Sequence, residues 1–195
     1  IASDKWVALG FRGRRKVLLA WSKLLMERIE ECTALISMET GKPVSDAKLE
    51  ASMAVSHIGW AARHAEDIMR TSYRAPGALM ANMSATVERS PLGVVGVIGP
   101  WNYPVFTPVG SIAYALAAGN TVVLKPAEST PLTALLFAEV CQQAELPAGV
   151  VNIVTGDGST GALIVNHPGI DKIAFTGSTE VGKIIARAVA PTNKS

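Results

Sequence analysis

Four short apolar runs alternate with helix-length segments from residue 94 onward, and no other feature of the chain restricts its possible folds as much. Each run is rich in β-branched residues, as strands buried on both faces are. The runs are Val94–Ile98, Thr121–Leu124, Val150–Val154 and Ile170–Phe175. Helices are predicted after them at Val109–Ala118, at Thr133–Ala144, up to about Asn166 and up to about Val189. Parallel neighbours need a crossover connection, so these units predict an α/β fold with a doubly wound parallel sheet.

The first 70 residues predict helices that pack on this sheet. Apolar residues from Val17 to Ile36 recur at steps of three and four, as on one face of a single helix. The segment Glu39–Pro43 then ends that helix with a glycine and a proline. An alanine-rich second helix follows, and residues 71–91 predict an edge strand or an arm. We therefore expect a helical region at 1–70, an arm at 71–91 and a sheet domain at 92–195.

Charge and cysteine content exclude several classes of protein. The net charge is +2, from 18 basic and 16 acidic residues, so we expect no nucleic-acid partner. The basic run Arg12–Lys16 predicts a solvated helix start rather than a polyanion site. Cys32 and Cys141 show no metal or CxxC spacing, so we expect no metal site and a cytoplasmic location. No segment approaches the ~20 apolar residues of a membrane span. The chain begins at Ile1 without a methionine, and we expect it to be a piece of a longer protein.

The turn after the first strand is the first candidate site. Pro100 and Pro104 frame it at the strand's carboxyl end, where ligands bind in open parallel sheets. Between them, the side-chain amide of Asn102 offers an N–H donor that a reacting oxygen could use. A tight turn in which Asn102 only caps the next helix explains the same residues. The sequence leaves both interpretations open.

Three more strand ends carry residues that suit a dinucleotide. Gly156–Gly161 fits GxGxxG, but the next strand ends at Phe175 without the acidic residue of that fingerprint. Gly177–Gly182 opens a helix whose N–H groups and hydroxyls suit a pyrophosphate, and a well-capped helix is the alternative. Lys125 and Glu128 suit ribose hydroxyls, and a surface ion pair is the alternative. Together, on one edge of a sheet, these loops predict a dinucleotide site.

Several motifs resemble signatures of the aldehyde dehydrogenase superfamily. They are GPWNYP at 99–104, KPAE at 125–128, FTGSTEVGK at 175–183, ETGKP at 39–43 and LPAGVVNIVTG at 146–156. The resemblance implies a variant Rossmann-type domain at 92–195, incomplete in this chain, that binds NAD, with NADP possible. It also implies an oxidoreductase that converts a small-molecule aldehyde to an acid through a cysteine thioester. In the intact enzyme it implies a homo-oligomer, either a dimer or a tetramer.

The resemblance assigns roles to individual residues. Asn102 matches the asparagine whose side-chain amide holds the oxyanion, and Lys125 with Glu128 matches the pair that binds the adenosine ribose. The strand end Ile98–Trp101 matches residues beside the nicotinamide and its ribose. The full cofactor-binding set implied is Ile98, Gly99, Pro100, Trp101, Lys125, Ala127, Glu128, Gly158, Phe175, Thr176, Gly177, Ser178, Val181 and Gly182.

The same resemblance separates the two glycine-rich turns. Gly177 and Ser178 match the family's pyrophosphate turn, with Val181 on the adenine side. Gly158, inside the letter-perfect GxGxxG, matches a glycine against which the adenine packs. Pattern reading alone ranks the two turns the other way.

The family's general-base glutamate and nucleophilic cysteine find no match in this chain. Cys32 and Cys141 lie on predicted helices away from any matching motif. We therefore expect an N-terminal, cofactor-binding part of an aldehyde dehydrogenase that is inactive by itself and prefers NAD because of Glu128. One alternative is a non-catalytic nucleotide-binding module or inactive remnant of the family. A purely structural assembly partner is another, but it leaves the clustered strand-end loops unexplained.

Overall fold

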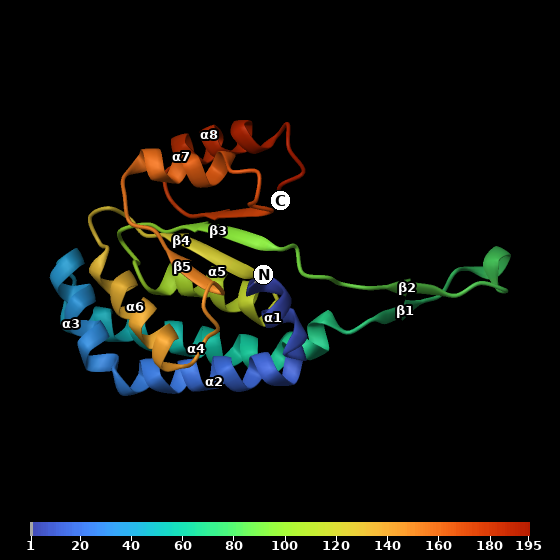
Figure 1. Cartoon of the computed structure of the whole chain (residues 1–195), viewed down its shortest axis with the longest axis horizontal. Helices are drawn as coiled ribbons and strands as arrows, with labels where there is room; N and C mark the ends of the chain where they lie inside the picture. The colour runs from blue at the N-terminus through green and yellow to red at the C-terminus, as the bar shows by residue number, and fades with distance from the viewer. Residues whose placement is uncertain (1) are drawn as a thin grey trace.

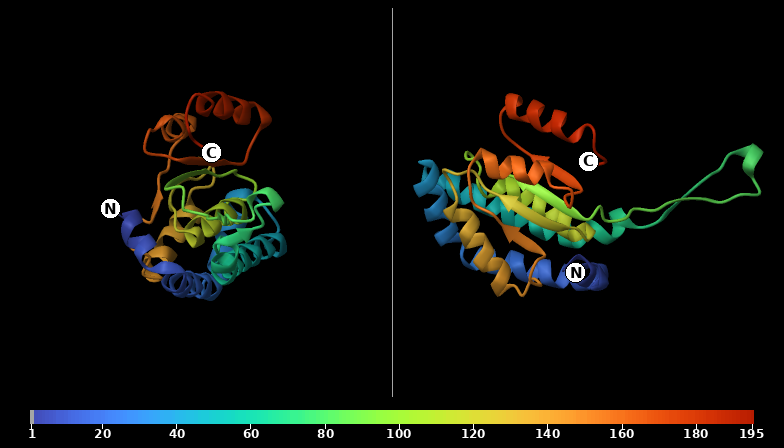
Figure 2. Two further views of the ribbon diagram at one scale, coloured as in Figure 1. Left: turned by 90° about the vertical axis from the view of Figure 1, so that its right-hand side faces the viewer. Right: turned by 45° about the horizontal axis from the view of Figure 1, so that its top comes forward.

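A parallel four-stranded sheet separates two layers of helices in the computed structural model, which describes residues 2–195 (Figure 1). The strand order is β5-β4-β3-β6, and every neighbouring pair is parallel. The strands are β3 (Val94–Ile98), β4 (Thr121–Lys125), β5 (Val151–Ile153) and β6 (Lys172–Phe175). Helices α7 (Gly158–Asn166) and α8 (Thr179–Val189) cover one face. Helices α5 (Phe106–Ala118) and α6 (Leu132–Gln143) cover the other (Figure 2). The predicted doubly wound parallel sheet is confirmed.

The centre of the sheet is apolar on both sides. On one face, Val95 and Val97 of β3 and their register partners Val122 and Leu124 of β4 are all buried. On the other face, Gly96 is buried against Ile164 of α7. This burial explains why β-branched runs without alternation identified the strands. The strand Val94–Ile98 has the predicted bounds, and the other three differ from prediction by one or two residues at their ends.

Four helices come from the first part of the chain. The three longer ones form a further layer beneath α5 and α6, and the first and shortest lies beside the sheet against β4 (Figures 1 and 2). The four are α1 (Ala2–Ala8), α2 (Gly10–Glu27), α3 (Ile29–Thr40) and α4 (Val44–Met69). The alanine-rich face of α4 is buried, which lets α5 approach it closely. On the other side, the Trp21 ring of α2 meets the Phe137 ring of α6 edge-on at 4.8 Å.

The single helix expected through Val17 and Ile36 is wrong, because the structure divides it into α2 and α3 at Arg28. The Arg28 guanidinium pairs with Glu31 at 2.7 Å and with Glu139 of α6 at 3.0 Å. These carboxylates raise the pKa of Arg28, the Glu31 hydrogen bond most of all. The apolar spacing continues across Arg28, so the local periodicity of the chain could not reveal the break.

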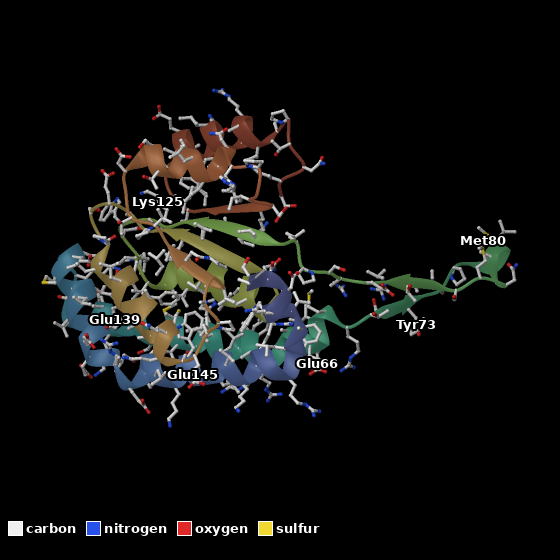
Figure 3. The ribbon with its side chains drawn as sticks, viewed as in Figure 1. Glu66, Tyr73, Met80, Lys125, Glu139 and Glu145 are labelled. Carbon is white, nitrogen blue, oxygen red and sulfur yellow. The ribbon has the colours of Figure 1, made fainter. Side chains whose placement is uncertain are left out.

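Part of the segment at 71–91 forms a narrow arm that extends away from the body (Figures 1 and 2). Strands β1 (Ser72–Arg74) and β2 (Ala85–Val87) pair antiparallel within it. A single 3-10 turn, η1 (Ala78–Met80), lies at its tip. Tyr73 and Met80 project from the arm into solvent (Figure 3), and Leu79 is 99% exposed. Over residues 2–195, no helix combines the length and the apolar character needed to cross a membrane.

Candidate functional site

The carboxyl ends of β3, β4 and β6 meet the beginnings of α7 and α8 around one open cleft of about 670 Å³. A volume of this size lies within the range of small-molecule sites. It is lined by Gly99, Pro100, Trp101, Asn102, Lys125, Ala127, Glu128, Ser129, Gly158, Phe175, Thr176, Gly177, Ser178 and Val181. Every predicted site residue except Ile98 and Gly182 is in this set. Ser129 lines the cleft too, although no pattern in the sequence identified it.

The turn after β3 presents its side chains to this cleft. The backbone N–H of Gly99 donates to the carbonyl of Lys125 at 3.0 Å, which ties the turn to the end of β4. A Cβ at Gly99 would lie 2.7 Å from the ring of Pro108, so the close approach requires glycine. Trp101 is 62% exposed at the rim. The side-chain amide of Asn102 has no hydrogen-bond partner within residues 2–195, and its donors are therefore available to a ligand.

The alternative role for Asn102, as a helix cap, is wrong. Helix α5 has no side-chain cap from its own N-cap residue, Val105. Instead, the Glu50 carboxylate on α4 accepts hydrogen bonds from the N–H groups of Val105 and Phe106, at 3.0 and 3.2 Å. This cap also explains why α5 begins at Phe106 rather than at the predicted Val109. Pro108 falls in the first helical turn, where a missing N–H is tolerated.

Lys125 is buried at the end of β4, beneath α7, where only 6% of its surface is exposed (Figure 3). Its ammonium donates to the carbonyl of Pro126 at 2.9 Å and forms no ion pair within the described residues. The surface ion pair with Glu128, offered as an alternative, is therefore wrong. An ammonium group carries three donors, and a buried donor without an acceptor is costly. The residue thus fits a ligand that brings several oxygen acceptors, as the hydroxyl groups of a ribose do.

The GxGxxG turn contains a carboxylate side chain of its own, that of Asp157. Asp157 caps α7, and its carboxylate accepts hydrogen bonds from the N–H of Ser159 at 2.9 Å and from its hydroxyl at 2.6 Å. These bonds, the one from the hydroxyl first, lower the pKa of Asp157, so the residue is negatively charged at neutral pH. Gly156 has φ 153°, and a Cβ there would lie 2.2 Å from the hydroxyl oxygen of Thr160. The glycine serves the turn, and the carboxylate disfavours a phosphate at this helix N-terminus.

The N-terminus of α8 has no carboxylate cap. The hydroxyl oxygen of Ser178 accepts a hydrogen bond from the N–H of Val181 at 3.3 Å, so the well-capped helix is present. Ser178 and Gly177 also line the cleft, whereas the acidic residue of the first turn, Glu180, does not. Of the two glycine-rich turns, this one is the better electrostatic environment for a phosphate group.

A second groove of about 270 Å³ opens between α7 and α8. Lys125, Gly158 and Val181 belong to both hollows, so the groove continues from the cleft. It is lined by Ile98, Lys125, Gly158, Gly161, Ala162, Val165, Asn166, Val181, Ile184, Ile185 and Ala188. Most of these side chains are apolar or absent, which suits a flat aromatic ring rather than a charged group.

Sequence reasoning missed most of this groove, although a signal was present. Val181, Ile184, Ile185 and Ala188 follow helical spacing and form one apolar stripe on α8. None of the residues of α8 is buried, and Val181 and Ile184 are 42% and 56% exposed, so much of the stripe is open to a ligand. Gly182 lines neither hollow; a Cβ there would be in ordinary contact, at 3.6 Å, with the ring of Phe175.

Both cysteines lie in the core and away from the cleft. Burial raises the pKa of Cys32 to about 12, and the nearby charges of Glu50 and Glu31 add to the effect. Burial also raises the pKa of Cys141. Thiols with such pKa values are poor nucleophiles at neutral pH. Over residues 2–195, no three His, Cys, Asp or Glu side chains come together as a metal site would require.

Comparison with known proteins gives a consistent result. The model of the aldehyde dehydrogenase family matches residues 1–195. Phenylacetaldehyde dehydrogenase of Pseudomonas fluorescens is 41% identical over 201 residues, covering 100% of this chain and 40% of that protein. The crystal structure of an NADP-dependent enzyme of E. coli superposes with a TM-score of 0.93 at 39% identity, covering 99% of this chain and 40% of the other.

An aldehyde dehydrogenase from Bacillus cereus, solved in complex with NAD⁺, superposes with a TM-score of 0.91 at 37% identity. It covers 97% of this chain, which in turn covers 38% of that one. This chain thus spans about 40% of the length of the relatives it matches.

Proposed function

This chain belongs to the aldehyde dehydrogenase family, and we propose that it forms the NAD(P)-binding cleft and supplies an oxyanion donor in an enzyme that oxidises aldehydes to carboxylic acids. The buried Lys125 ammonium carries this proposal, because it has one carbonyl partner and lines the same cleft as the free amide of Asn102. A ligand with hydroxyl groups supplies the acceptors that the protein does not.

The proposed cofactor, NAD or NADP, supplies the electron acceptor for the oxidation when it is bound. Lys125 donates to the hydroxyls of the adenosine ribose, and Glu128 accepts from them. The N-terminus of α8, at Gly177 and Ser178, receives the diphosphate. This assignment is supported by the carboxylate of Asp157, which makes the α7 turn unfavourable for phosphate. The apolar groove between α7 and α8 suits the adenine ring.

We propose NAD as the preferred cofactor. The carboxylate of Glu128 is exposed in the cleft and unpaired within the described residues, so it is free to accept from two ribose hydroxyls. In NADP one hydroxyl is replaced by a phosphate, which would face Glu128 as a second anion. Lys125 opposes this effect because its ammonium attracts the phosphate.

Asn102 acts on the aldehyde rather than on the cofactor. As a nucleophile adds to the carbonyl carbon, negative charge develops on the carbonyl oxygen, and the amide N–H group of Asn102 donates to it. A fixed donor that needs no reorganisation stabilises such a charge strongly. The amide suits this role because no hydrogen bond within residues 2–195 occupies it.

We propose that the 195-residue polypeptide does not oxidise aldehydes by itself, because both of its thiols are buried and protonated at neutral pH. The same observation supports a second candidate, a nucleotide-binding module without catalysis. The two candidates differ in one measurement, which is aldehyde oxidation by a protein of the relatives' length that contains these residues.

We also propose the domain bounds, the oligomeric state and the location of the enzyme, each from a single observation. We place the helical region at 1–70, the arm at 71–91 and the cofactor domain at 92–195. The arm's exposed Leu79, Met80 and Met83 support contact with a second copy, hence a homo-oligomer. Two free cysteines support a cytoplasmic location.

The test begins with binding. A calorimetric titration of the 195-residue chain with NADH should show saturable binding. If no binding is seen, the proposed cofactor site is refuted. In an enzyme of the relatives' length that carries this chain, Asn102→Ala should lower kcat by about 10²–10³ while the Kd for NAD stays within about twofold. Asn193→Ala, at an exposed residue outside the cleft, is the matched control. A loss of NAD affinity at unchanged kcat would contradict the assigned role of Asn102.

A further inference from the structure

The short turn Glu39–Pro43 between α3 and α4 is in contact with two helices that begin beside the cleft. The carboxylate of Glu39 accepts hydrogen bonds from the N–H groups of Leu132 and Thr133, the latter at 3.1 Å, at the start of α6. The ammonium of Lys42 pairs with Glu50, the residue that caps α5. The motif ETGKP therefore does more than end a helix: it joins two site helices to the N-terminal layer.

Glu50 is a buried carboxylate whose two oxygens are both in use. One oxygen accepts from the N–H groups of Val105 and Phe106, and the other receives Lys42. The side chain of Glu50 is fully buried, and that of Lys42 is 18% exposed. Charge-assisted bonds to a helix N-terminus in such surroundings are short and directional. They fix the first turn of α5 against α4, although the partners are 55 residues apart in sequence.

The contacts of this pair fall on the residues of the turn that directly follow Asn102. Val105 follows Asn102 by three residues, and its N–H is held by Glu50. Tyr103 follows Asn102 directly, and the ammonium of Lys42 lies 3.6 Å from the centre of its ring. Neither contact uses the amide of Asn102 itself, so the turn is held while its donor stays free.

We propose that Glu50 and Lys42 are positioning residues for Asn102: together they hold the turn that carries it, so that the amide N–H is already in place when the oxyanion forms. The proposal rests on the function proposed above for Asn102. Small displacements of a catalytic group lower the rate strongly, and about 1 Å can reduce it roughly 10²-fold. A cap with only a structural role would change stability and leave the rate per folded molecule unchanged.

Amide hydrogen exchange on the 195-residue chain tests, without any catalysis, whether Glu50 holds the first turn of α5. In Glu50→Gln, the amides of Val105 and Phe106 should exchange at least tenfold faster than in the wild type. Ile36→Val, at a fully buried apolar residue of α3, controls for a general loss of stability. Equal protection of these amides in Glu50→Gln and in the wild type would overturn the proposal.

Kinetics in an enzyme of the relatives' length that carries this chain tests the consequence. Glu50→Gln and Lys42→Met should each lower kcat about 10- to 100-fold, with the Kd for NAD unchanged within twofold. Lys42→Arg should restore most of the rate, because arginine keeps both the charge and the contact with the Tyr103 ring. If Glu50→Gln does not fold, the Lys42 pair of variants still decides the question.

The possible outcomes distinguish a failure of the positioning role from a failure of the proposed function on which it rests. A wild-type enzyme that does not oxidise aldehydes overturns the proposed function and, with it, the role of Asn102. A working enzyme in which Glu50→Gln and Lys42→Met keep the wild-type kcat overturns the positioning role alone. A fall in kcat that Ile36→Val reproduces at matched melting temperature also overturns it, because lost stability then explains the effect.

Discussion

Replacing Lys125 by methionine should separate ligand binding from stability. The substitution keeps the length of the side chain and removes its charge and its three donors. One of these donors is used by the carbonyl of Pro126 in the free protein. The other two are available for ribose hydroxyls. The substitution should therefore weaken cofactor binding and leave the stability of the free protein almost unchanged.

The magnitude follows from the number of free donors. Hydrogen bonds to charged groups contribute about 1.5–3 kcal/mol each, so two of them correspond to about 3–6 kcal/mol. Since about 1.4 kcal/mol is a tenfold change, the Kd for NADH should rise by roughly two to four orders of magnitude. In the free protein, a buried ammonium with a single partner is replaced by an apolar chain at little or no cost. The melting temperature of Lys125→Met should therefore stay equal or rise by about 2–4 °C for each kcal/mol gained.

The assay needs only the 195-residue chain. NADH titrations by calorimetry give the Kd, and circular dichroism gives the melting temperature without ligand. Lys23→Met, whose side chain is 78% exposed on α2, is the matched control and should change neither value. The reasoning is refuted if Lys125→Met binds NADH as the wild type does, or if its affinity and its melting temperature fall together.

Three further predictions follow from the cleft and from the shifted pKa values. Glu128→Gln should move the ratio of kcat/KM for NADP over NAD upward by about tenfold or more, since like charges at close range cost on the order of 1–4 kcal/mol; an unchanged ratio means that Glu128 does not discriminate. The folded pKa of Asp157 lies below its ordinary value of 3.8, so its cap stabilises the fold above that pH and is lost as pH falls through the lower value. Melting curves between pH 2.5 and 7 should then fall less steeply for Asp157→Asn than for the wild type, and identical curves would contradict the cap. For Cys32 the sign is opposite: its pKa rises from 9.0 to about 12 on folding, so the stabilisation is complete below pH 9 and is lost as pH rises toward 12. Denaturant unfolding above pH 9 should show a steeper loss for the wild type than for Cys32→Ala, by up to about 1.4 kcal/mol per pH unit, and equal slopes would show that the thiol titrates normally in the fold.

Local pattern was enough to predict the sheet and the loops that surround the cleft. The strand Val94–Ile98 was identifiable because its β-branched residues are buried from both sides, and the turn after it because two prolines frame it. What could not be predicted depends on partners distant in the chain. Glu50 caps a helix 55 residues away, and Arg28, between α2 and α3, pairs with Glu139 of another helix. No periodicity within one segment contains such information.

The burial of Lys125 is a second feature that local sequence pattern could not predict. In sequence it stands next to Pro126 and Glu128 in a loop that suggests an exposed ion pair. Only the packing of α7 over the end of β4 reveals that the residue is 6% exposed and that its ammonium donates to a carbonyl instead of pairing with Glu128. The position of Lys125 beside the cleft was therefore predictable, whereas its burial and its hydrogen-bond partner were not.

The N-terminal helices belong to the site as much as the sheet does. Glu39 on α3 satisfies the first N–H groups of α6, and Glu50 on α4 satisfies those of α5, so two of the helices that follow cleft loops are capped from the outer layer. A lost cap costs about 0.5–2 kcal/mol, and here each loss would fall beside a loop that lines the cleft. Residues 92–195 without α3 and α4 would therefore keep the sequence motifs of the cleft and lose the contacts that hold its loops in place. The cleft is thus a product of two layers, in which the sheet presents the side chains and the helices beneath it fix their positions.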